Sequence, residues 1–513
     1  MSSPKTPSIM SNVEPDVGFV ALPKLSKTLL LVILSIAEFL DTFSNSALFS
    51  AIPPICEDLN ISNSNSVWIQ SGYQLTFAAL LLMSGRLSDL YNPKWVFVAG
   101  GILLGLFSLG AGLVRSEIPL LLFRALMGVG AALTVPSALH IIVHMLPDPK
   151  AQSNAVAIFT ASGGIGNIFG LLIGAVFVSF ASWPWIFFFI AIMALVESAL
   201  VLVLCHNVKR PKTSTFDHMK RLQRLDVVGV AFFTASLILF IFAVTSGSIS
   251  GWGTAGVIAP LVISVALMLA FLFYETRIPT DIAVIPPKTW TYTNIIIMLS
   301  MATLPYMWWG SVQSLFSWYW QEVFGYSPIT TAVHFLPIGL SAIPSAALAD
   351  KLQTKVRVKW ILAVGNVLAT AGSIFLPFGS TRARFWPVIF PGLVIGSFGI
   401  SMVFTTSNVA IFTNTPPEAA GVIAAMFNSA LQLGCAAGIA ITTSIQTSIG
   451  VENGDPNSFS GRADGFWFLV AVTALVGAVG LVLMKDVRQQ AVKESDEVPM
   501  TVPEGFSIEK EVE

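Results

Sequence analysis

Four ionisable residues lie deep inside long apolar stretches of this sequence, where charged groups are rare. Glu38 and Asp41 are three positions apart, so in a helix they would share one face. Arg124 and Glu197 stand alone in two later stretches. A charged group at the centre of a bilayer costs roughly 2.5 to 3.5 kcal/mol, so such groups usually face a cavity or a partner. These residues are therefore the first candidates for chemistry.

Two interpretations of Asp41 follow. A carboxyl group in a poorly hydrated cavity can bind and release a proton near neutral pH, as a proton-coupled carrier requires. Alternatively, Asp41 and Arg124 form a static ion pair, although their expected depths in the membrane differ by roughly 9 Å. We expect Asp41 to be the proton-coupling residue, with Glu38 and Arg124 beside it, and Glu197 to be structural.

The stretches that carry these residues are long enough to cross a membrane. Of 513 residues, 54% are hydrophobic and 11% are charged, whereas soluble domains carry about 25% charged residues. Stretches of at least about 18 apolar residues, the length of a membrane-spanning helix, cover approximately residues 28–51, 67–85, 95–114, 119–143, 154–179, 185–205, 226–246, 256–274, 294–316, 329–349, 360–378, 386–412, 419–445 and 464–484. Because lipid offers no partner for backbone polar groups, we predict an all-α protein with 14 transmembrane helices.

The loops predict how the chain is oriented and divided. Loops on the side of both termini hold 22 of the 27 Lys and Arg residues, so both termini should be cytoplasmic. We expect a monomer in the plasma membrane, with the vacuolar membrane as second choice. The predicted segments are a disordered N-terminus (1–27), a six-helix bundle (28–205), a basic linker (206–225), two inserted helices (226–274), a loop (275–293), a second six-helix bundle (294–484) and an acidic tail (485–513).

Other classes of function find no support in the sequence. The net charge of −1 and the scattered basic residues argue against nucleic-acid binding. The three cysteines, Cys56, Cys205 and Cys435, are far apart and lack metal-ligand spacing. No Gly-x-x-x-x-Gly-Lys-Ser/Thr sequence is present to bind ATP. We therefore expect no enzymatic activity, no metal and no cofactor, with a proton gradient as the energy source.

A short pattern occurs twice, at equivalent points of the chain. Gly85-Arg86-Leu87-Ser88-Asp89 follows the second span, and Lys94-Trp95 opens the third. Ala346-Ala347-Leu348-Ala349-Asp350 follows the tenth span, and Lys359-Trp360 opens the eleventh. Such repeats build transporters with two bundles around a central site, which predicts a 6 + 2 + 6 arrangement. As local structure, Asp89 and Asp350 would cap the helices that follow them.

These motifs resemble the major facilitator superfamily, and within it the fourteen-span drug:proton antiporters, with most similarity to fungal aminotriazole-resistance-type exporters. The resemblance is carried by Leu40-Asp41-Thr42, Gly85-x-Leu87-x-Asp89, Arg124 with Gly128 and Gly130, the glycines of the fifth span, and Trp183-Pro184-Trp185. It implies proton-coupled efflux of a drug, toxic compound or secondary metabolite by alternating access. It also implies a gating role for the loop residues Gly85, Asp89, Asp350 and Lys351.

The chain departs from the family pattern at three points. Leu90 and Asn92 replace a basic residue and a glycine in the loop motif, and Met127 replaces a glutamine in the fourth span. Gly166-Asn167 replaces the Gly-Pro of the fifth-span antiporter motif, which bears on the direction and coupling of transport. Proton-coupled uptake and a non-transporting sensor on the same fold therefore stay open as alternatives.

Small, aromatic and polar residues complete the predicted site. Glycines recur on one stripe of the fifth span, where they favour close helix packing and would form a surface on which the halves rock; they are Gly163, Gly166, Gly170 and Gly174. Tryptophans near the outer surface, such as Trp318 and Trp320, predict an aromatic belt. The predicted substrate cavity comprises Asn45, Trp308, Trp309, Gln313, Asn408 and Gln432, with packing as an equal alternative for the two tryptophans. Asn60-Ile61-Ser62 is a glycosylation sequon in a predicted outer loop.

Overall fold

The computed structural model describes residues 23–62, 65–146, 148–205, 226–279, 283–413, 415, 419–455 and 458–485. Long helices account for most of these residues, and each of the predicted spans falls on one of them. The helices are α2 (Lys24–Leu59), α3 (Val67–Leu90), α4 (Pro93–Leu113), α5 (Glu117–Met145), α6 (Pro149–Phe180), α7 (Pro184–Leu204), α9 (Val227–Ser250), α10 (Ala255–Glu275), α11 (Ile295–Trp318), α12 (Pro328–Gln353), α13 (Val358–Phe375), α14 (Phe390–Thr413), α15 (Ala420–Glu452) and α16 (Ser460–Leu483). The described residues contain no strand, so the all-α prediction is confirmed.

Within the described part of the chain, 12 helices are long and apolar enough to cross a membrane. The two long helices outside this group are α2 and α3, which carry polar residues such as Asp41, Gln70 and Gln74 among their apolar ones. The protein is therefore a multi-span membrane protein, while the number of 14 spans stays a prediction.

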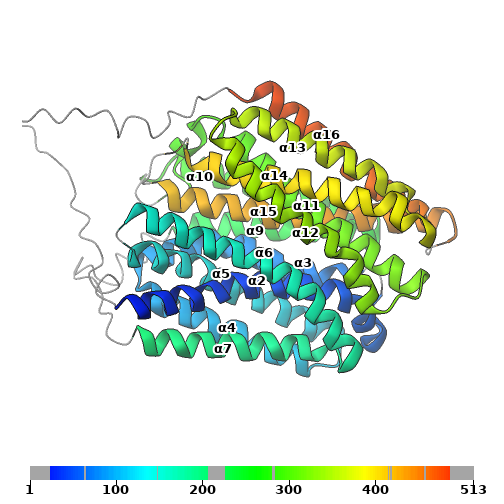
Figure 1. The fold of residues 1–513 in the computed structure, drawn as a ribbon, viewed down its shortest axis with the longest axis horizontal. Coiled ribbons are helices and arrows are strands. Elements are labelled where there is room, and N and C mark those ends of the chain that lie inside the picture. The colour runs from blue at the N-terminus through cyan, green and yellow to red at the C-terminus, as the bar shows by residue number, and fades with distance from the viewer. Residues whose placement is uncertain are drawn as a thin grey trace, which may run out of the picture.

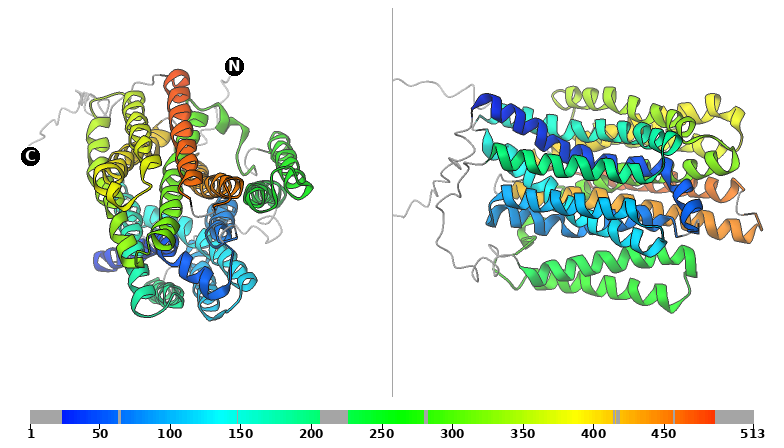
Figure 2. Two further views of the ribbon diagram at one scale, coloured as in Figure 1. Left: turned by 90° about the vertical axis from the view of Figure 1, so that its right-hand side faces the viewer. Right: turned by 90° about the horizontal axis from the view of Figure 1, so that it is seen from below.

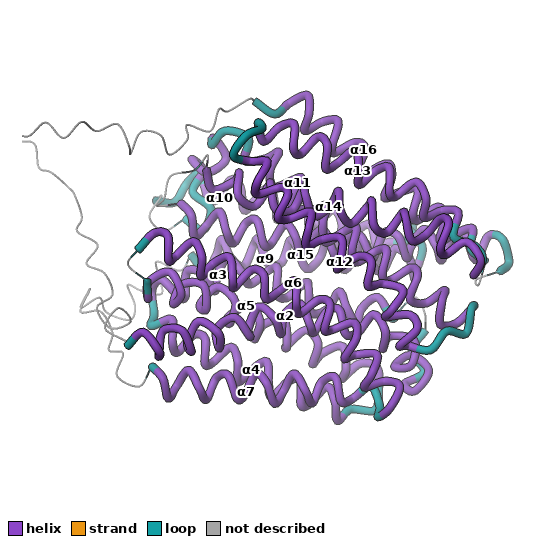
Figure 3. Tube along the Cα trace, viewed as in Figure 1, coloured by secondary structure: helices purple, strands orange, loops and turns teal. Residues whose placement is uncertain are grey.

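The helices lie side by side along one common direction and form an elongated bundle (Figure 1). Figure 3 shows that the described connections gather at the two ends of this bundle. Helix α2 begins and α16 ends at the same end (Figure 1). This arrangement keeps backbone polar groups paired inside helices along the length of the bundle, as a lipid environment requires.

Two large hydrophobic cores organise the bundle. One is built from α2 to α7 and includes Leu30, Phe97 and Val201. The other is built mainly from α11 to α16 and includes Met298 and Leu469. The second core also takes in a few side chains of α2, α3, α6 and α9, so the two groups of helices are in direct contact.

Helices α9 and α10 lie together at one edge of the bundle in both views of Figure 2. Helix α9 packs against α3 and α15, whereas α10 packs chiefly against α9. A small separate core, which includes Leu82 of α3, Val230 of α9 and Phe271 of α10, joins the pair to the rest. The pair is inserted in the sequence between the two six-helix groups, and its position at the edge leaves the contact between the large cores intact.

The glycine stripe of α6 packs against α2. Added Cβ atoms at Gly163, Gly166, Gly170 and Gly174 would press on Glu38, Phe39, Phe43 and Ala47 of α2, respectively. The Thr42 hydroxyl also donates to the Gly163 carbonyl at 2.8 Å. Because these glycines face α2 of the same half, the stripe is not the surface between the halves that we expected from the sequence. The close approach explains the glycines without any sliding.

The second half of the chain repeats this packing with different residues. An added Cβ at Gly434 of α15 would collide with the backbone of Thr303 on α11, and one at Gly438 would lie 2.6 Å from Cγ of Met307. In each half, therefore, the first helix and the fifth approach closely through glycine.

The two repeated lysines also have equivalent partners. Lys94 at the start of α4 donates from Nζ to the carbonyl of Cys205 at 2.8 Å, where α7 ends. Lys359 at the start of α13 donates to the carbonyl of Met484 at 3.2 Å, where α16 ends. Each lysine thus satisfies a free carbonyl at the end of the sixth helix of its own half, a favourable place for a cation.

Candidate functional site

Asp41 is the centre of a buried polar group in the first half of the bundle. Its side chain is 4% exposed, and Oδ1 accepts a hydrogen bond of 2.6 Å from the hydroxyl of Tyr73 on α3. Tyr73 itself is fully buried. A single short bond from a phenol holds the carboxyl group in one orientation while leaving it without an ion-pair partner among the described residues.

Arg124 of α5 approaches Asp41 through Tyr73. Its guanidinium carbon lies 4.6 Å from the centre of the Tyr73 ring. Nε donates to the carbonyl of Ile69 at 2.8 Å, and Nη1 donates to the hydroxyl of Ser44 at 2.9 Å. No ion pair joins Arg124 to Asp41, so the sequence alternative of a static pair is not what the structure shows. Tyr73 instead contacts both charged groups.

Tyr73 is the residue that sequence reasoning missed. The signal was present, because Gln70, Tyr73 and Gln74 are polar residues at helical spacing in a stretch otherwise suited to lipid. Both glutamines are buried, and Gln70 donates to the carbonyl of Asn45 at 3.0 Å. Gln70 and Tyr73 therefore make polar contacts with α2, whereas Gln74 makes one with α15.

Glu38 lies one helical turn before Asp41, as the spacing predicted. It keeps a partly exposed side chain, and its carboxyl group lies beside Gly163 of α6. Tyr306 of α11 is within electrostatic range of both Glu38 and Asp41.

Unpaired side-chain oxygens occur in both halves of the bundle. The side-chain oxygens of Asn45, Gln74, Gln313 and Gln432 are buried and accept no hydrogen bond from any described residue. Gln74 donates from Nε2 to Sγ of Cys435 on α15 at 2.9 Å. Because buried acceptors normally have partners, these atoms are available to water or to a ligand. Asn408 of α14 is partly exposed, but no described contact joins it to this group.

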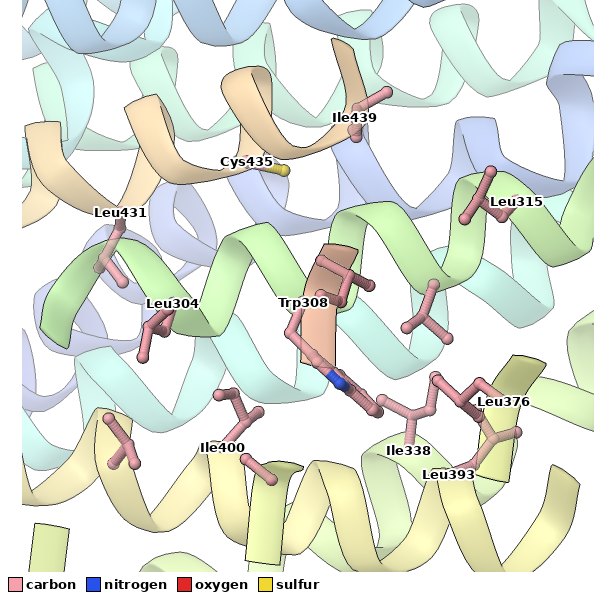
Figure 4. Packing of buried hydrophobic residues seen from close by; sticks show 14 of the residues in the cluster. Leu304, Trp308, Leu315, Ile338, Leu376, Leu393, Ile400, Leu431, Cys435 and Ile439 are labelled. Atoms are coloured by element: carbon pink, nitrogen blue, oxygen red, sulfur yellow. The ribbon is translucent and has the colours of Figure 1, made fainter. Parts of the chain in front are cut away.

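Trp309 and Trp308 have different environments. Trp309 is partly exposed and lies with Tyr306 and Phe404 in a group of three rings whose centres are 5.9 to 6.3 Å apart. Trp308 is completely buried and donates from Nε1 to the Ser373 hydroxyl at 2.8 Å. Figure 4 shows its indole ring pointing toward Ile338. We therefore correct the predicted cavity by removing Trp308, which packs in the second core.

The outer aromatic residues need a similar correction. Trp320 is 2% exposed, and its ring packs on Phe316 and Phe335 at 4.7 and 4.8 Å between centres. Trp318 packs partly against the first core. Trp320 therefore fills protein interior and is not part of the lipid-facing belt predicted from the sequence, while Trp318 is only partly buried.

The repeated loop motif is placed differently from the prediction. Asp350 and Lys351 lie in the last turns of α12 and are exposed, and Asp89 is the penultimate residue of α3. Neither aspartate is the N-cap residue of the next helix, because α3 and α12 continue through the motif; the N-cap residues are Asn92 and Arg357. The cap of α4 is Asn92, whose side chain accepts from the Lys94 N–H at 3.1 Å. The Asp89 side chain lies outside the described residues, and the gating role stays a prediction.

Glu197 and Asn60 lie apart from this group. Glu197 of α7 is 1% exposed, and neither carboxyl oxygen has a hydrogen-bond partner among the described residues. Asn60 follows α2 in a left-handed conformation with φ of 54° and is exposed. Glycosylation at Asn60 stays a prediction. Gly85 has no neighbour within 4 Å of an added Cβ, so packing does not require its glycine.

Residues 34–439 match the model of the Major Facilitator Superfamily, which is most of the chain. The chain belongs to this superfamily. The superfamily consists of membrane transporters, so the protein is a transport protein and not an enzyme, as its sequence predicted. The major facilitator fold, which the resemblance implied, is confirmed by the same match, whereas the number of 14 spans stays a prediction.

Similar curated proteins match most of the length of this major facilitator chain. A "Major facilitator superfamily multidrug transporter mfsC" of Aspergillus fumigatus is 27% identical over 475 residues, covering 90% of this chain and 87% of that protein. The "Puromycin resistance protein pur8" of Streptomyces alboniger is 29% identical over 421 residues, covering 81% of each chain. Among solved structures, a bacterial homolog of the human lysosomal transporter Spinster in an inward-facing and occupied conformation matches with a TM-score of 0.61 and 15% identity. The match covers 91% of this chain and 98% of that one.

Proposed function

We propose that this protein is a proton-coupled exporter of small organic compounds that works by alternating access. The observation that carries the proposal is the buried Asp41 carboxyl group, which is held by Tyr73 and backed by Arg124 without a direct ion pair. Because no direct ion pair fixes the Asp41 carboxyl group, its protonation changes the net charge of the whole group.

The charges of the group support an exchange of proton for substrate. Glu38 and Asp41 carry two negative charges when ionised, and Arg124 carries one positive charge, so the group has an excess of one negative charge. One proton or one positively charged substrate group neutralises this excess. Because a low-dielectric site disfavours net charge, the two compete for the same place. Mutual exclusion of proton and substrate is the physical basis of antiport.

The aromatic group on the facing half supports an organic substrate. The rings of Tyr306, Trp309 and Phe404 offer faces on which a flat or cationic molecule can stack. The names of the relatives point the same way, since they include a multidrug transporter, a puromycin resistance protein and a "Cephamycin export protein CmcT" of Amycolatopsis lactamdurans.

Alternating access requires the helices 28–205 and 294–484 to move as two bodies on either side of the site. The two cores and the repeated glycine and lysine contacts support this 6 + 2 + 6 division. Contacts that such a motion would break include the bond from Gln74 to Cys435 and the bond from the Ser429 hydroxyl to the Ala78 carbonyl at 3.1 Å. The loop charges support cytoplasmic termini, and we propose this orientation for a monomer in the plasma membrane.

The proposal is tested by flux in proteoliposomes under an imposed pH gradient, with a panel of aromatic organic cations and weak acids. We expect the wild type to exchange at least one cation for protons. Asp41→Asn keeps the shape of the side chain but cannot ionise, so proton-driven flux should fall at least about 100-fold. Tyr73→Phe removes one bond to the carboxylate, which is worth about 1.5 to 3 kcal/mol, and should slow flux without abolishing it.

Glu57→Gln provides the matched control, because Glu57 is an exposed carboxylate on the same helix. This variant should transport at the wild-type rate. Normal proton-driven flux in Asp41→Asn would remove Asp41 from the mechanism.

Proton-coupled uptake is the second candidate. One relative, the "Low affinity ammonium transporter" of Saccharomyces cerevisiae, is 23% identical over 385 residues, covering 74% of each chain. The direction of transport distinguishes export from uptake. Export predicts that cells lacking the protein accumulate more substrate, whereas uptake predicts that they accumulate less.

A further inference from the structure

An apolar groove lies between α12 and the beginning of α14, outside the group of residues that the proposed transport function uses. Its volume is about 460 Å³, within the range of roughly 300 to 1,000 Å³ that is typical of ligand pockets. The wall on the side of α14 begins in a π-helical turn, η5 (Phe385–Ile389). The side chains that form the two walls include Val333, Pro337 and Leu340 of α12 and Trp386, Phe390 and Val394 of η5 and α14.

The groove opens toward lipid and not toward the transport site. Leu340 and Trp386 on its walls are 60% and 71% exposed, and exposed apolar side chains of a membrane-spanning helix contact lipid. On their buried side, α12 and α14 are joined by Ser397, whose hydroxyl donates to the Ile338 carbonyl at 2.8 Å and accepts from Nε1 of Trp309 at 3.2 Å. This bonded contact separates the groove from the aromatic group that we assign to the substrate.

The groove follows the direction of the helices. Val333 and Ser341 of α12 both line it, and they are more than two helical turns apart, or about 12 Å along the helix axis. Because the helices share one common direction (Figure 1), the groove is parallel to the acyl chains of the surrounding bilayer. A long apolar groove in this direction fits an acyl chain.

Two arginines stand at the end of the groove where α14 begins. Arg382 and Arg384 are exposed, and the short turn that contains them, η4, ends where the groove wall begins. Arg384 donates to the Phe378 carbonyl at 3.0 Å, and Arg382 donates to the Phe324 carbonyl. Their other contacts with described residues are with aromatic rings and not with carboxylates. The two positive charges are therefore available to an anion.

Basic residues are rare on this side of the membrane. The proposed orientation places this end of α12 and α14 outside the cell, where the loops hold only Arg115, Arg382, Arg384 and Arg462. The exposed indole of Trp386 is typical of the boundary between hydrocarbon and head groups. The arginine pair just before Trp386 is thus at the level of the head groups, where its charge is complementary to a phosphate.

We propose that the groove binds one phospholipid, with an acyl chain between α12 and α14 and the phosphate on Arg384. The chain covers the exposed faces of Leu340 and Trp386, and Arg382 adds a second positive charge beside the phosphate. Because Ser397 joins the groove wall to Trp309, the bound lipid also supports the helix packing that holds the aromatic group. This inference goes beyond the proposed function, and only the choice of the outer leaflet rests on the proposed orientation.

Native mass spectrometry of the purified protein in detergent tests the site without any transport. The probe is dioleoylphosphatidylglycerol, and the comparison is dioleoylglycerol, which has the same chains and no phosphate. We expect the wild type to retain one phosphatidylglycerol with an affinity about tenfold higher than that for dioleoylglycerol. This comparison requires no substitution. Equal affinity for the two lipids, or preferential retention of cholesterol, would overturn the proposal.

Two variants test the two parts of the site separately. Arg384→Gln removes the charge that holds the phosphate, so the affinity for phosphatidylglycerol should fall to that for dioleoylglycerol. Leu340→Trp fills the groove from an exposed position, so specific retention of both lipids should be lost. Wild-type affinity in both variants would show that lipid binds the bundle without this site, and the proposal would be wrong.

Matched controls exist for both variants. Arg115→Gln removes another exposed arginine that donates to backbone carbonyls, and Val367→Trp adds an indole at an exposed position of α13 outside the groove. Both should bind phosphatidylglycerol as the wild type does. Asp41→Asn should also bind it normally while losing proton-driven flux, so a failure of the proposed function is distinguishable from a failure of the lipid site.

Discussion

Helices α2 and α11 occupy equivalent places, since each is the first helix of its half and packs through glycine against the fifth. Matching Gly166 with Gly434 and Gly170 with Gly438 by their contacts places Pro305 of α11 where α2 has Asp41. The same match places Trp309 where α2 has Asn45. One half therefore supplies charge at the centre of the bundle and the other supplies aromatic surface.

This difference shows that the repeat preserves the scaffold and not the chemistry. Close helix packing and the lysine bonds to helix-end carbonyls both depend on backbone atoms, which every repeat contains. Proton exchange requires one unusual carboxyl group in one place, and a second copy would add the cost of another buried charge. The scaffold is therefore duplicated, whereas the charged group is found in one half.

The largest expected effect is a loss of folded protein, and it should be the same for substitutions in either half. Gly170→Leu and Gly434→Leu would force side-chain atoms into the backbone of the neighbouring helix, and overpacking costs roughly 1 to 3 kcal/mol or more. In size-exclusion chromatography, most of each variant should therefore be missing from the peak of folded protein. Gly164→Leu is the control, because an added Cβ there meets nothing within 4 Å. A folded Gly434→Leu protein would break the equivalence of the two halves.

A smaller effect, on transport flux, should differ between the buried arginines of the two halves. Arg124→Lys cannot keep the separate bonds to Ile69 and Ser44, so flux per folded molecule should fall about tenfold. Arg462, at the start of α16, is also buried and lies 5.0 Å from the Tyr319 ring centre. Arg462→Lys should lower the melting temperature but keep flux within about twofold of the wild type. Equal losses of flux would contradict the assignment of charge chemistry to the first half.

The smallest effect concerns the repeated lysines. Lys94→Met and Lys359→Met each remove a charged donor from a helix-end carbonyl, so both should lower the melting temperature by a few degrees. Lys94 should matter more, since it is 5% exposed and its bond is shorter. Lys355→Met, at an exposed position, should leave the melting temperature unchanged. If Lys359→Met left the melting temperature unchanged, the contact between lysine and a helix-end carbonyl would stabilise only the first half.

Much of the candidate site was visible before the fold was known. Glu38, Asp41 and Arg124 attract attention because charge in an apolar stretch is costly, and the structure places Asp41 and Arg124 on the same tyrosine. Trp308 could not be assigned in this way. Indole groups serve equally well in cores and in binding sites, and only the neighbours Ser373 and Ile338 show that this one is packed away.

The sequence by itself determined the class of protein, the helices and the internal repeat, because these depend on local apolar length and on short motifs. Only the tertiary structure decided which helix faces which. It placed the glycine stripe inside one half and paired Lys94 with a carbonyl 111 residues away. The physical reason is that one helix face can pack against several partners, and the choice among them is made by the packing of the whole bundle.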